Sequence, residues 1–229
     1  MKNSTAITDV FFDLDHTLWD FEKNSALAFE TVLAKHLPYI DVAAFLKVYV
    51  PLNFAYWERY RKDEITQEEL RLGRLRDTFA AMNCDVSEEM LAFLSHEYIH
   101  VLPDYNHLFE GATEILDYLK TKYRLHIITN GFDKVQYLKI SNANLGHYFT
   151  TVTNSEMAGV KKPNARIFEH ALELASAKKE TSIMIGDCIE ADVRGAINCG
   201  IDAILFCAPD ISYDGIKHVN HLSEIKNYL

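Results

Sequence analysis

The stretch Val10-Phe11-Phe12-Asp13-Leu14-Asp15-His16-Thr17 decides the fold of this 229-residue chain. Its first three residues form an apolar run, which is typical of a buried strand. Asp13 and Asp15 follow that run directly, so both carboxylates are expected at the carboxyl end of the strand, where open α/β sheets bind their ligands. Two like charges so close together are costly unless a cation lies between them or one carboxyl keeps its proton. A simple acidic turn with no chemical role is the alternative.

Three later segments carry further polar groups in a fixed order. Residues 125–131 (LHIITNG) form an apolar strand that ends in a hydroxyl, an amide and a glycine. Residues 159–163 (GVKKP) place two lysines before a proline. Residues 182–192 (SIMIGDCIEAD) predict a strand, a glycine turn and a helix that carries two acids. Four such segments in one order are far more specific evidence for a catalytic site than any one of them alone.

The rest of the chain predicts an α/β domain with an inserted helical block. From residue 104 onward strands and helices alternate, which implies a parallel sheet with helices on both faces. Residues 19–103 follow a helical pattern throughout, with a capping box at Thr66-Gln67-Glu68-Glu69. Since the first strand precedes this block, the block is inserted into the α/β domain.

In chain order the four segments read DxDxT, a strand-terminal threonine, Lys-Pro and GDxxxxD. This series resembles the four motifs of the haloacid dehalogenase (HAD) superfamily, spaced as its phosphatases space them, from residue 10 to about residue 206. The resemblance implies a Rossmann-like parallel sheet with an inserted all-helical cap between the first and second motifs. The predicted domains are residues 1–18 and 104–229 for the catalytic core, and residues 19–103 for the cap.

The resemblance also implies a reaction, the hydrolysis of a phosphomonoester through an aspartyl-phosphate intermediate. Asp13 would be the nucleophile, and Asp15 would protonate the leaving oxygen and then activate water. Asp13, the backbone carbonyl of Asp15, and Asp187 would hold Mg²⁺, a hard ion that prefers oxygen ligands.

Phosphoryl transfer further requires positive charge and hydrogen-bond donors around the phosphate oxygens. The resemblance gives the cation role to Lys162, because the family lysine directly precedes the proline. Thr129 would donate its hydroxyl to the phosphate, and the turn at Asn130 would offer a backbone N–H. Asp192 would support Lys162 or a metal-bound water.

The helical block carries the features that suggest a substrate. Residues 53–60 (NFAYWERY) are similar to the cap of a bacterial pyrimidine 5′-nucleotidase branch. This implies nucleoside 5′-monophosphates as substrates, with pyrimidines favoured. Asn53 and Trp57 are the candidate contacts, since an aromatic ring can stack on a base. A core-packing role for the Trp57 ring and a solvated helix position for Asn53 are equally open.

Several other functions remain as alternatives. A sugar-phosphate phosphatase or a mutase of the same fold would use the same core motifs. A metal-independent 2-haloacid dehalogenase needs no acid at position 15, so Asp15 counts against it. A non-catalytic binding module would not need Asp13, Asp15, Lys162 and Asp187 together. The roles of His16 and Cys188, which depart from the usual family pattern, are left open.

One short motif points to a different chemistry. Residues 96–100 (HEYIH) match the HExxH signature of zinc proteases. The extended pattern fails, because Pro103 stands where a glycine is required and Asn106 where the third histidine is required. The zinc interpretation is therefore set aside.

Composition restricts the partners. A net charge of −10 and a pI near 5.4 argue against nucleic acid polymers and anionic membranes, which attract basic surfaces. Residues 1–6 show no apolar leader, no segment approaches a membrane span of about 20 residues, and the four cysteines form no CxxC pair. A cytoplasmic enzyme acting on a small phosphorylated metabolite is expected, and its oligomeric state is not predicted.

Overall fold

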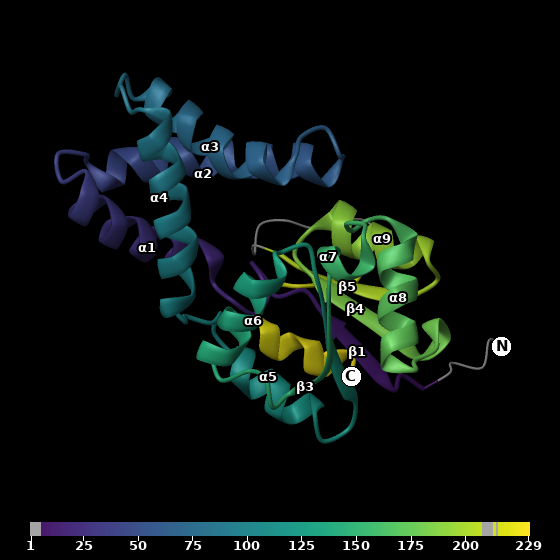
Figure 1. Ribbon diagram of the computed structural model, residues 1–229. Helices are drawn as coiled ribbons and strands as arrows, with labels where there is room; N and C mark the ends of the chain where they lie inside the picture. The colour runs from purple at the N-terminus through teal and green to yellow at the C-terminus, as the bar shows by residue number, and fades with distance from the viewer. Residues whose placement is uncertain (1–5, 208–212, 214) are drawn as a thin grey trace. The chain divides into compact units, whose positions relative to one another are not determined.

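The computed structural model describes residues 6–207, 213 and 215–229 (Figure 1). The chain divides into two compact units, Met1–Phe21 with Asn106–Leu229, and Glu22–Tyr105. Residues 1–5 lie outside the described residues. The expectation that residues 1–6 show no apolar leader falls mostly on them. Within the described ranges, no helix combines the length and the apolar character needed to cross a membrane.

The first unit is built on a six-stranded parallel sheet in the order β3-β2-β1-β4-β5-β6. The predicted α/β class is thereby confirmed. Phe12 in β1 is paired with Ile127 in β2 and Ile185 in β4, so these three strands end close together at one edge. The strands are β1 (Asp9–Phe12), β2 (Arg124–Thr129), β3 (Phe149–Asn154), β4 (Ser182–Gly186), β5 (Asp202–Phe206) and β6 (His218–Val219).

Helices cover both faces of this sheet, as Figure 1 shows. Phe168 and Ala171 of α8 pack with Phe11 and Met184 of the central strands in one apolar cluster. The helices of this unit are α5 (Ala112–Leu119), α6 (Asp133–Asn142), α7 (Ser155–Ala158), α8 (Ala165–Ala175) and α9 (Gly195–Asn198), with 3₁₀ turns at Lys179–Thr181 and Leu222–Asn227.

The segment after β4 differs from the regular helix that the sequence predicts after the glycine turn. It begins as a π-helical turn, Ile189–Arg194, and only then continues as α9. The carbonyl oxygen of Cys188 accepts from the backbone N–H of both Asp192 (2.9 Å) and Val193 (3.3 Å), which widens the turn. The Asp192 carboxylate accepts in return from the Cys188 backbone N–H at 2.9 Å. The widened turn thus fixes a buried acid next to the end of β4.

The second unit consists of helices alone, as predicted for the inserted block. Thr66 caps α3 by accepting from the Glu69 backbone N–H at 3.1 Å, and Ser87 caps α4 in the same way. Aromatic rings form the core, with Phe29 stacked on Tyr98 at a centroid distance of 4.1 Å. The helices are α1 (Phe21–His36), α2 (Val42–Arg61), α3 (Gln67–Ala81) and α4 (Glu88–Val101), followed by a 3₁₀ turn at Leu102–Asp104.

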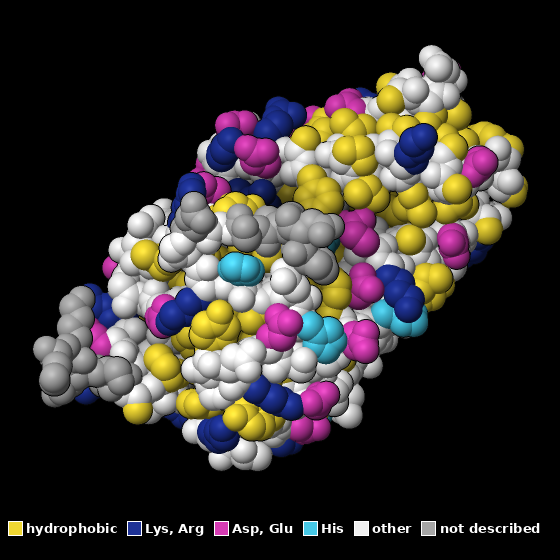
Figure 2. Space-filling model, turned by 180° about the vertical axis from the view of Figure 1, so that it is seen from behind, with side chains coloured by type: hydrophobic (Ala, Val, Ile, Leu, Met, Phe, Trp, Pro, Cys, Tyr) yellow, Lys and Arg dark blue, Asp and Glu magenta, His cyan; other side chains and the backbone are white. Residues whose placement is uncertain are grey.

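Charged side chains are spread over the molecular surface. On the face shown in Figure 2, acidic and basic side chains are interspersed, and neither sign forms a continuous field. The net negative charge is therefore distributed, which gives no extended basic surface on this face for a polyanion.

Candidate active site

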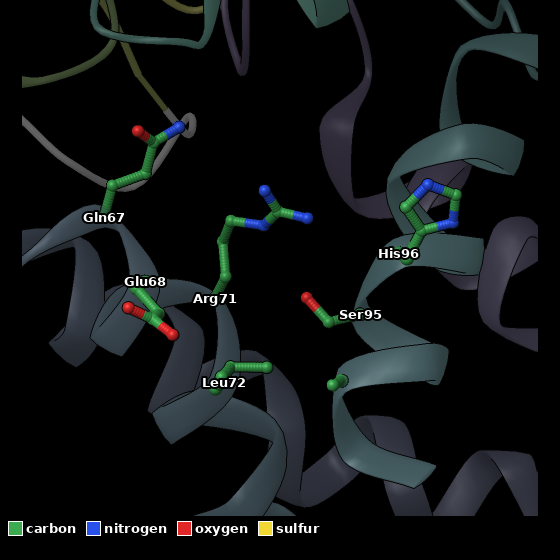
Figure 3. Close-up of a pocket in the computed structure, with 7 residues that line it drawn as sticks. Gln67, Glu68, Arg71, Leu72, Ser95 and His96 are labelled. Atoms are coloured by element: carbon green, nitrogen blue, oxygen red, sulfur yellow. The ribbon is translucent and has the colours of Figure 1, made fainter. Parts of the chain in front are cut away.

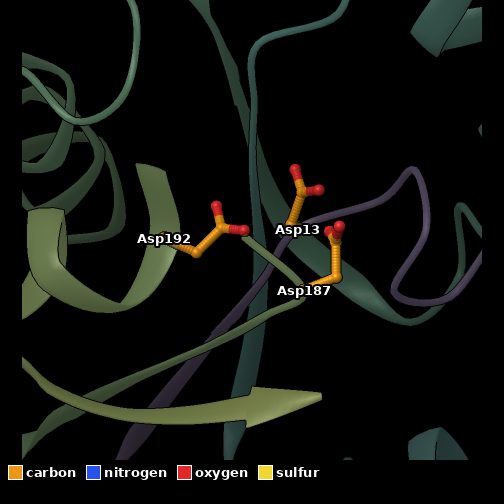
Figure 4. A group of neighbouring side chains, drawn as sticks. All are labelled: Asp13, Asp187 and Asp192. Carbon is orange, nitrogen blue, oxygen red and sulfur yellow. The ribbon is translucent and has the colours of Figure 1, made fainter. Parts of the chain in front are cut away.

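Three carboxylates gather at the carboxyl edge of the sheet. Asp13 follows β1, Asp187 follows β4, and Asp192 lies in the widened turn (Figure 4). Each of them offers an oxygen atom that lies within 4.8 Å of the others. Gly186 permits this approach, because a Cβ there would lie 2.4 Å from the carboxyl carbon of Asp192.

The electrostatics of this group indicate a place for a cation. Burial raises the pKa of Asp13 well above its usual value; Lys162 opposes this shift, and the charges of Asp192 and Asp187 add to it. Burial also raises the pKa of Asp187 to about 7, again assisted by Asp192. Carboxylates whose ionisation is opposed by burial and by their mutual repulsion are suited to a hard divalent ion such as Mg²⁺, which stabilises the ionised form. The donor set therefore fits the predicted metal.

Lys162 provides the fixed positive charge of the site. Its side chain is 2% exposed, and its amine donates to Asp13 Oδ1 at 2.7 Å and to the Ile128 carbonyl at 2.7 Å. The same amine forms an ion pair with Asp192 Oδ1 at 2.6 Å. Burial lowers the pKa of Lys162, but the charges of Asp13 and Asp192 outweigh burial and raise this pKa above its usual value. The lysine is therefore charged.

Asn130 holds the backbone around that lysine. Its side-chain amide donates to the Lys162 carbonyl at 3.0 Å, and its side-chain oxygen accepts from the Lys162 backbone N–H at 2.7 Å. The Asn130 side chain therefore bonds the backbone of Lys162. A backbone contact from Asn130 to substrate stays a prediction.

Thr129 and Asp15 are joined by a shared donor. The Thr129 hydroxyl oxygen accepts from the Gly131 backbone N–H (3.1 Å) and from the Gln136 amide (2.6 Å), which leaves its own proton available to donate. The same Gln136 amide donates to Asp15 at 3.0 Å. Lys139 donates to the other Asp15 oxygen at 2.6 Å. The Asp15 carboxylate therefore faces α6 and is not one of the three clustered acids.

Gln136 and Lys139 were not anticipated from the sequence. Both lie on one face of α6, and Lys139 is 2% exposed, with its amine 4.2 Å from the centre of the Trp19 ring. The apolar side chains Tyr137 and Leu138 of the same helix are instead 71% and 41% exposed. A helix that buries an amide and an amine while exposing apolar residues is unusual for a purely structural element.

The two candidates from the helical unit occupy positions on α2. Asn53 is buried, and its side-chain oxygen accepts from Arg74 Nη1 at 2.7 Å. Trp57 is half-buried, and its ring meets that of Tyr60 edge-on at 5.7 Å. Their part in substrate binding stays a prediction.

The remaining singled-out residues have local roles. His16 adopts a left-handed backbone conformation, and its ring lies 4.9 Å from that of Phe21. The Cys188 sulfur accepts from the Ala191 backbone N–H at 3.4 Å. The HExxH residues of α4 do not form a metal-binding group, since among described residues only the three clustered aspartates do so.

This chain is similar in sequence and in fold to several known proteins. Residues 10–206 match the haloacid dehalogenase-like hydrolase family. The pyrimidine 5′-nucleotidase PynA of Streptococcus pneumoniae is 34% identical over 199 residues, which cover 86% of this chain and 82% of that protein. The glyceraldehyde 3-phosphate phosphatase of Methanothermobacter thermautotrophicus is 30% identical over 201 residues, which cover 86% and 84%. The magnesium-bound crystal structure of Bacillus subtilis YfnB is similar with a TM-score of 0.89 at 24% identity, covering 98% of this chain and 99% of that one.

Replacing Lys162 with methionine should destabilise the fold, because Asp13 and Asp192 would lose their shared buried counter-charge. Breaking a buried ion pair in this way typically lowers the free energy of unfolding by about 3–5 kcal/mol. Urea denaturation in EDTA at pH 7 measures the change. Lys178→Met removes an exposed lysine and serves as the control. A loss for Lys162→Met that matches this control would show that the buried ion pairs contribute nothing.

Proposed function

The chain belongs to the haloacid dehalogenase-like hydrolases, and on that premise we propose that it is a Mg²⁺-dependent phosphatase of small phosphorylated metabolites, with pyrimidine nucleoside 5′-monophosphates as its preferred substrates. The observation that carries the proposal is the Lys162 amine between Asp13 and Asp192, at the edge where Asp187 also lies. This arrangement offers a nucleophilic carboxylate, a fixed cation and oxygen ligands for a metal in one place.

In the first step, an oxygen of Asp13 would attack phosphorus and form an acyl phosphate as the bond to the leaving oxygen breaks. Asp15 would give its proton to that leaving oxygen. Lys162 and the Thr129 hydroxyl would hold the equatorial phosphate oxygens. Mg²⁺, held by Asp13, Asp187 and the Asp15 carbonyl, would supply positive charge to the phosphoryl group.

In the second step, water would attack the phosphorus of the acyl phosphate, and the Asp13 carboxylate would be restored as orthophosphate leaves. Asp15 would take a proton from that water. Gln136 and Lys139 donate to the two oxygens of the Asp15 side chain at 3.0 and 2.6 Å and so fix its orientation for this step. Asp192 would keep Lys162 in place throughout.

Two relatives are named for different substrates, and we rank these substrates by the sequence identity of each relative to this chain. The 34% identical relative is named a pyrimidine 5′-nucleotidase, and the 30% identical one a glyceraldehyde 3-phosphate phosphatase. Nucleotides are therefore the first candidates, with Trp57 as a ring for base stacking and Asn53 as a polar contact. Sugar and triose phosphates are the second. The four cysteines are free thiols, which agrees with the proposed cytoplasmic location.

A panel of phosphate esters tests the function and its metal. Orthophosphate release should be fastest from pyrimidine nucleoside 5′-monophosphates, should stop in excess EDTA and should return with Mg²⁺. Asp187→Asn should remove this response to Mg²⁺, because the site loses one anionic ligand. A preference for glyceraldehyde 3-phosphate would instead favour the second candidate. Halide release from 2-haloacids in EDTA, without phosphatase activity, would overturn the proposal.

Asp13→Asn should lower turnover by at least about a thousandfold, because the amide keeps the shape of the side chain but cannot attack phosphorus. The free energy of unfolding should not fall, since one of three repelling carboxylates is removed. Steady-state kinetics and urea denaturation check the two expectations. Asp202→Asn, which alters an exposed ion pair with Lys217, is the matched control. Near-normal turnover of Asp13→Asn would rule out this nucleophile.

Lys139→Met should slow turnover by about a hundredfold, within the range that a positioned general acid–base contributes. The KM for p-nitrophenyl phosphate should fall together with turnover, because a slower second step lets the acyl phosphate accumulate, whereas kcat/KM should change little. The good leaving group needs no proton, so a stopped-flow burst of p-nitrophenolate should appear as the second step becomes limiting. Lys134→Met removes an exposed lysine from the same helix as a control. Unchanged turnover without a burst would remove Lys139 from the mechanism.

A further inference from the structure

The helical unit contains a recess of about 450 Å³ between α3 and α4 (Figure 3). This volume lies within the range of small-molecule sites, which is about 300–1,000 Å³. All of the residues that line the recess come from these two helices. None of them is among the residues assigned to phosphoryl transfer, so the recess requires its own explanation.

Arg71 is the first feature of the recess that indicates a ligand. Its guanidinium is half-buried and points into the recess, and it has no hydrogen bond or ion pair to any described residue. The next arginines along α3 each have a partner: Arg74 Nη1 donates to Asn53 at 2.7 Å, and Arg76 donates to Glu88 at 2.8 Å. Burial lowers the pKa of Arg71, and the charge of Arg74 lowers it further. An unpaired, half-buried cation is unexpected in a chain with a net charge of −10.

Ser95 is the second and independent feature. Its side chain is 2% exposed, and its hydroxyl oxygen has no hydrogen-bond partner within the described part of the chain. In Figure 3 this hydroxyl projects from α4 toward the same space that Arg71 enters from α3. A buried hydroxyl without a partner is costly, and the cost is relieved when a ligand occupies the site.

We propose that this recess binds an oxyanion, the carboxylate or phosphate group of a small metabolite. The Arg71 guanidinium would form two parallel hydrogen bonds to the anionic oxygens, a geometry for which its planar fork is suited. The Ser95 hydroxyl would donate a third bond from the opposite wall. Gln67, on the same face of α3, offers an amide for a neutral polar part of the ligand. The anion is either a separate ligand or a group of the substrate itself.

Isothermal titration calorimetry with inorganic phosphate and with succinate tests the site on the full-length protein. Excess EDTA is present, so that the metal-free aspartates at the catalytic edge repel anions. The wild type should bind at least one of the two probes. Arg71→Gln should weaken binding by about ten- to a hundredfold, and Ser95→Ala by about two- to tenfold. Arg76→Gln removes an ion-paired arginine from the same helix and should leave affinity unchanged. Thermal unfolding of each variant verifies the fold.

Steady-state kinetics then separates the two sources of the anion. If the ligand is separate, Arg71→Gln keeps the wild-type KM for every substrate and loses only the probe affinity. If the substrate supplies the anion, the KM for that substrate rises while p-nitrophenyl phosphate is unaffected. The proposal is overturned if neither probe binds the wild type at about 10 mM. It is also overturned if Arg71→Gln binds them as tightly as the wild type does.

Discussion

The groups at the carboxyl edge of the sheet depend on one interaction, in which the carboxylates of Asp13 and Asp192 share the buried Lys162 amine. Asp13, Asp187 and Asp192 carry three negative charges when ionised, and Lys162 supplies one positive charge, which leaves two negative charges in a largely buried space. Such an excess is unfavourable without a counter-ion. One divalent cation balances it, whereas a monovalent cation would leave one negative charge uncompensated. Lys162 thus determines that a divalent cation balances the charge at this edge. The carboxylate oxygens determine that the cation is a hard ion.

The end of β2 organises most of the groups around this lysine. The Ile128 carbonyl accepts from the Lys162 amine, and the Asn130 side chain holds the Lys162 backbone through two hydrogen bonds. Thr129, between them, reaches Asp15 through the Gln136 amide. Three consecutive residues therefore connect the Lys162 amine, the Thr129 hydroxyl and the Asp15 carboxylate. A displacement of β2 against β1 would disturb all three together.

Much of this arrangement could be predicted from the sequence, because it is encoded locally. Each buried strand is a short apolar run followed by its polar residues, so the carboxylates after β1 and β4 could be assigned to one sheet edge. Lys139 and Gln136 could not be found in this way. Their burial depends on what packs against α6, and a helical pattern alone assigns such side chains to solvent. The widened turn that carries Asp192 was missed for a similar reason, since it depends on hydrogen bonds between Asp192 and Cys188.

The insertion of the helical unit between β1 and β2 also has a consequence for how the chain folds. β1 lies in the middle of the sheet, yet both of its neighbours, β2 and β4, follow the whole helical unit in the chain. The contacts between α2 and α3 and between α3 and α4 join helices that are neighbours in the sequence and carry a small loop-closure entropy, so we expect this unit to form early. Its folding would bring Glu22 and Tyr105 into one compact body and shorten the effective loop between β1 and β2. The inserted unit would thereby lower the entropic barrier to assembly of the sheet that it interrupts.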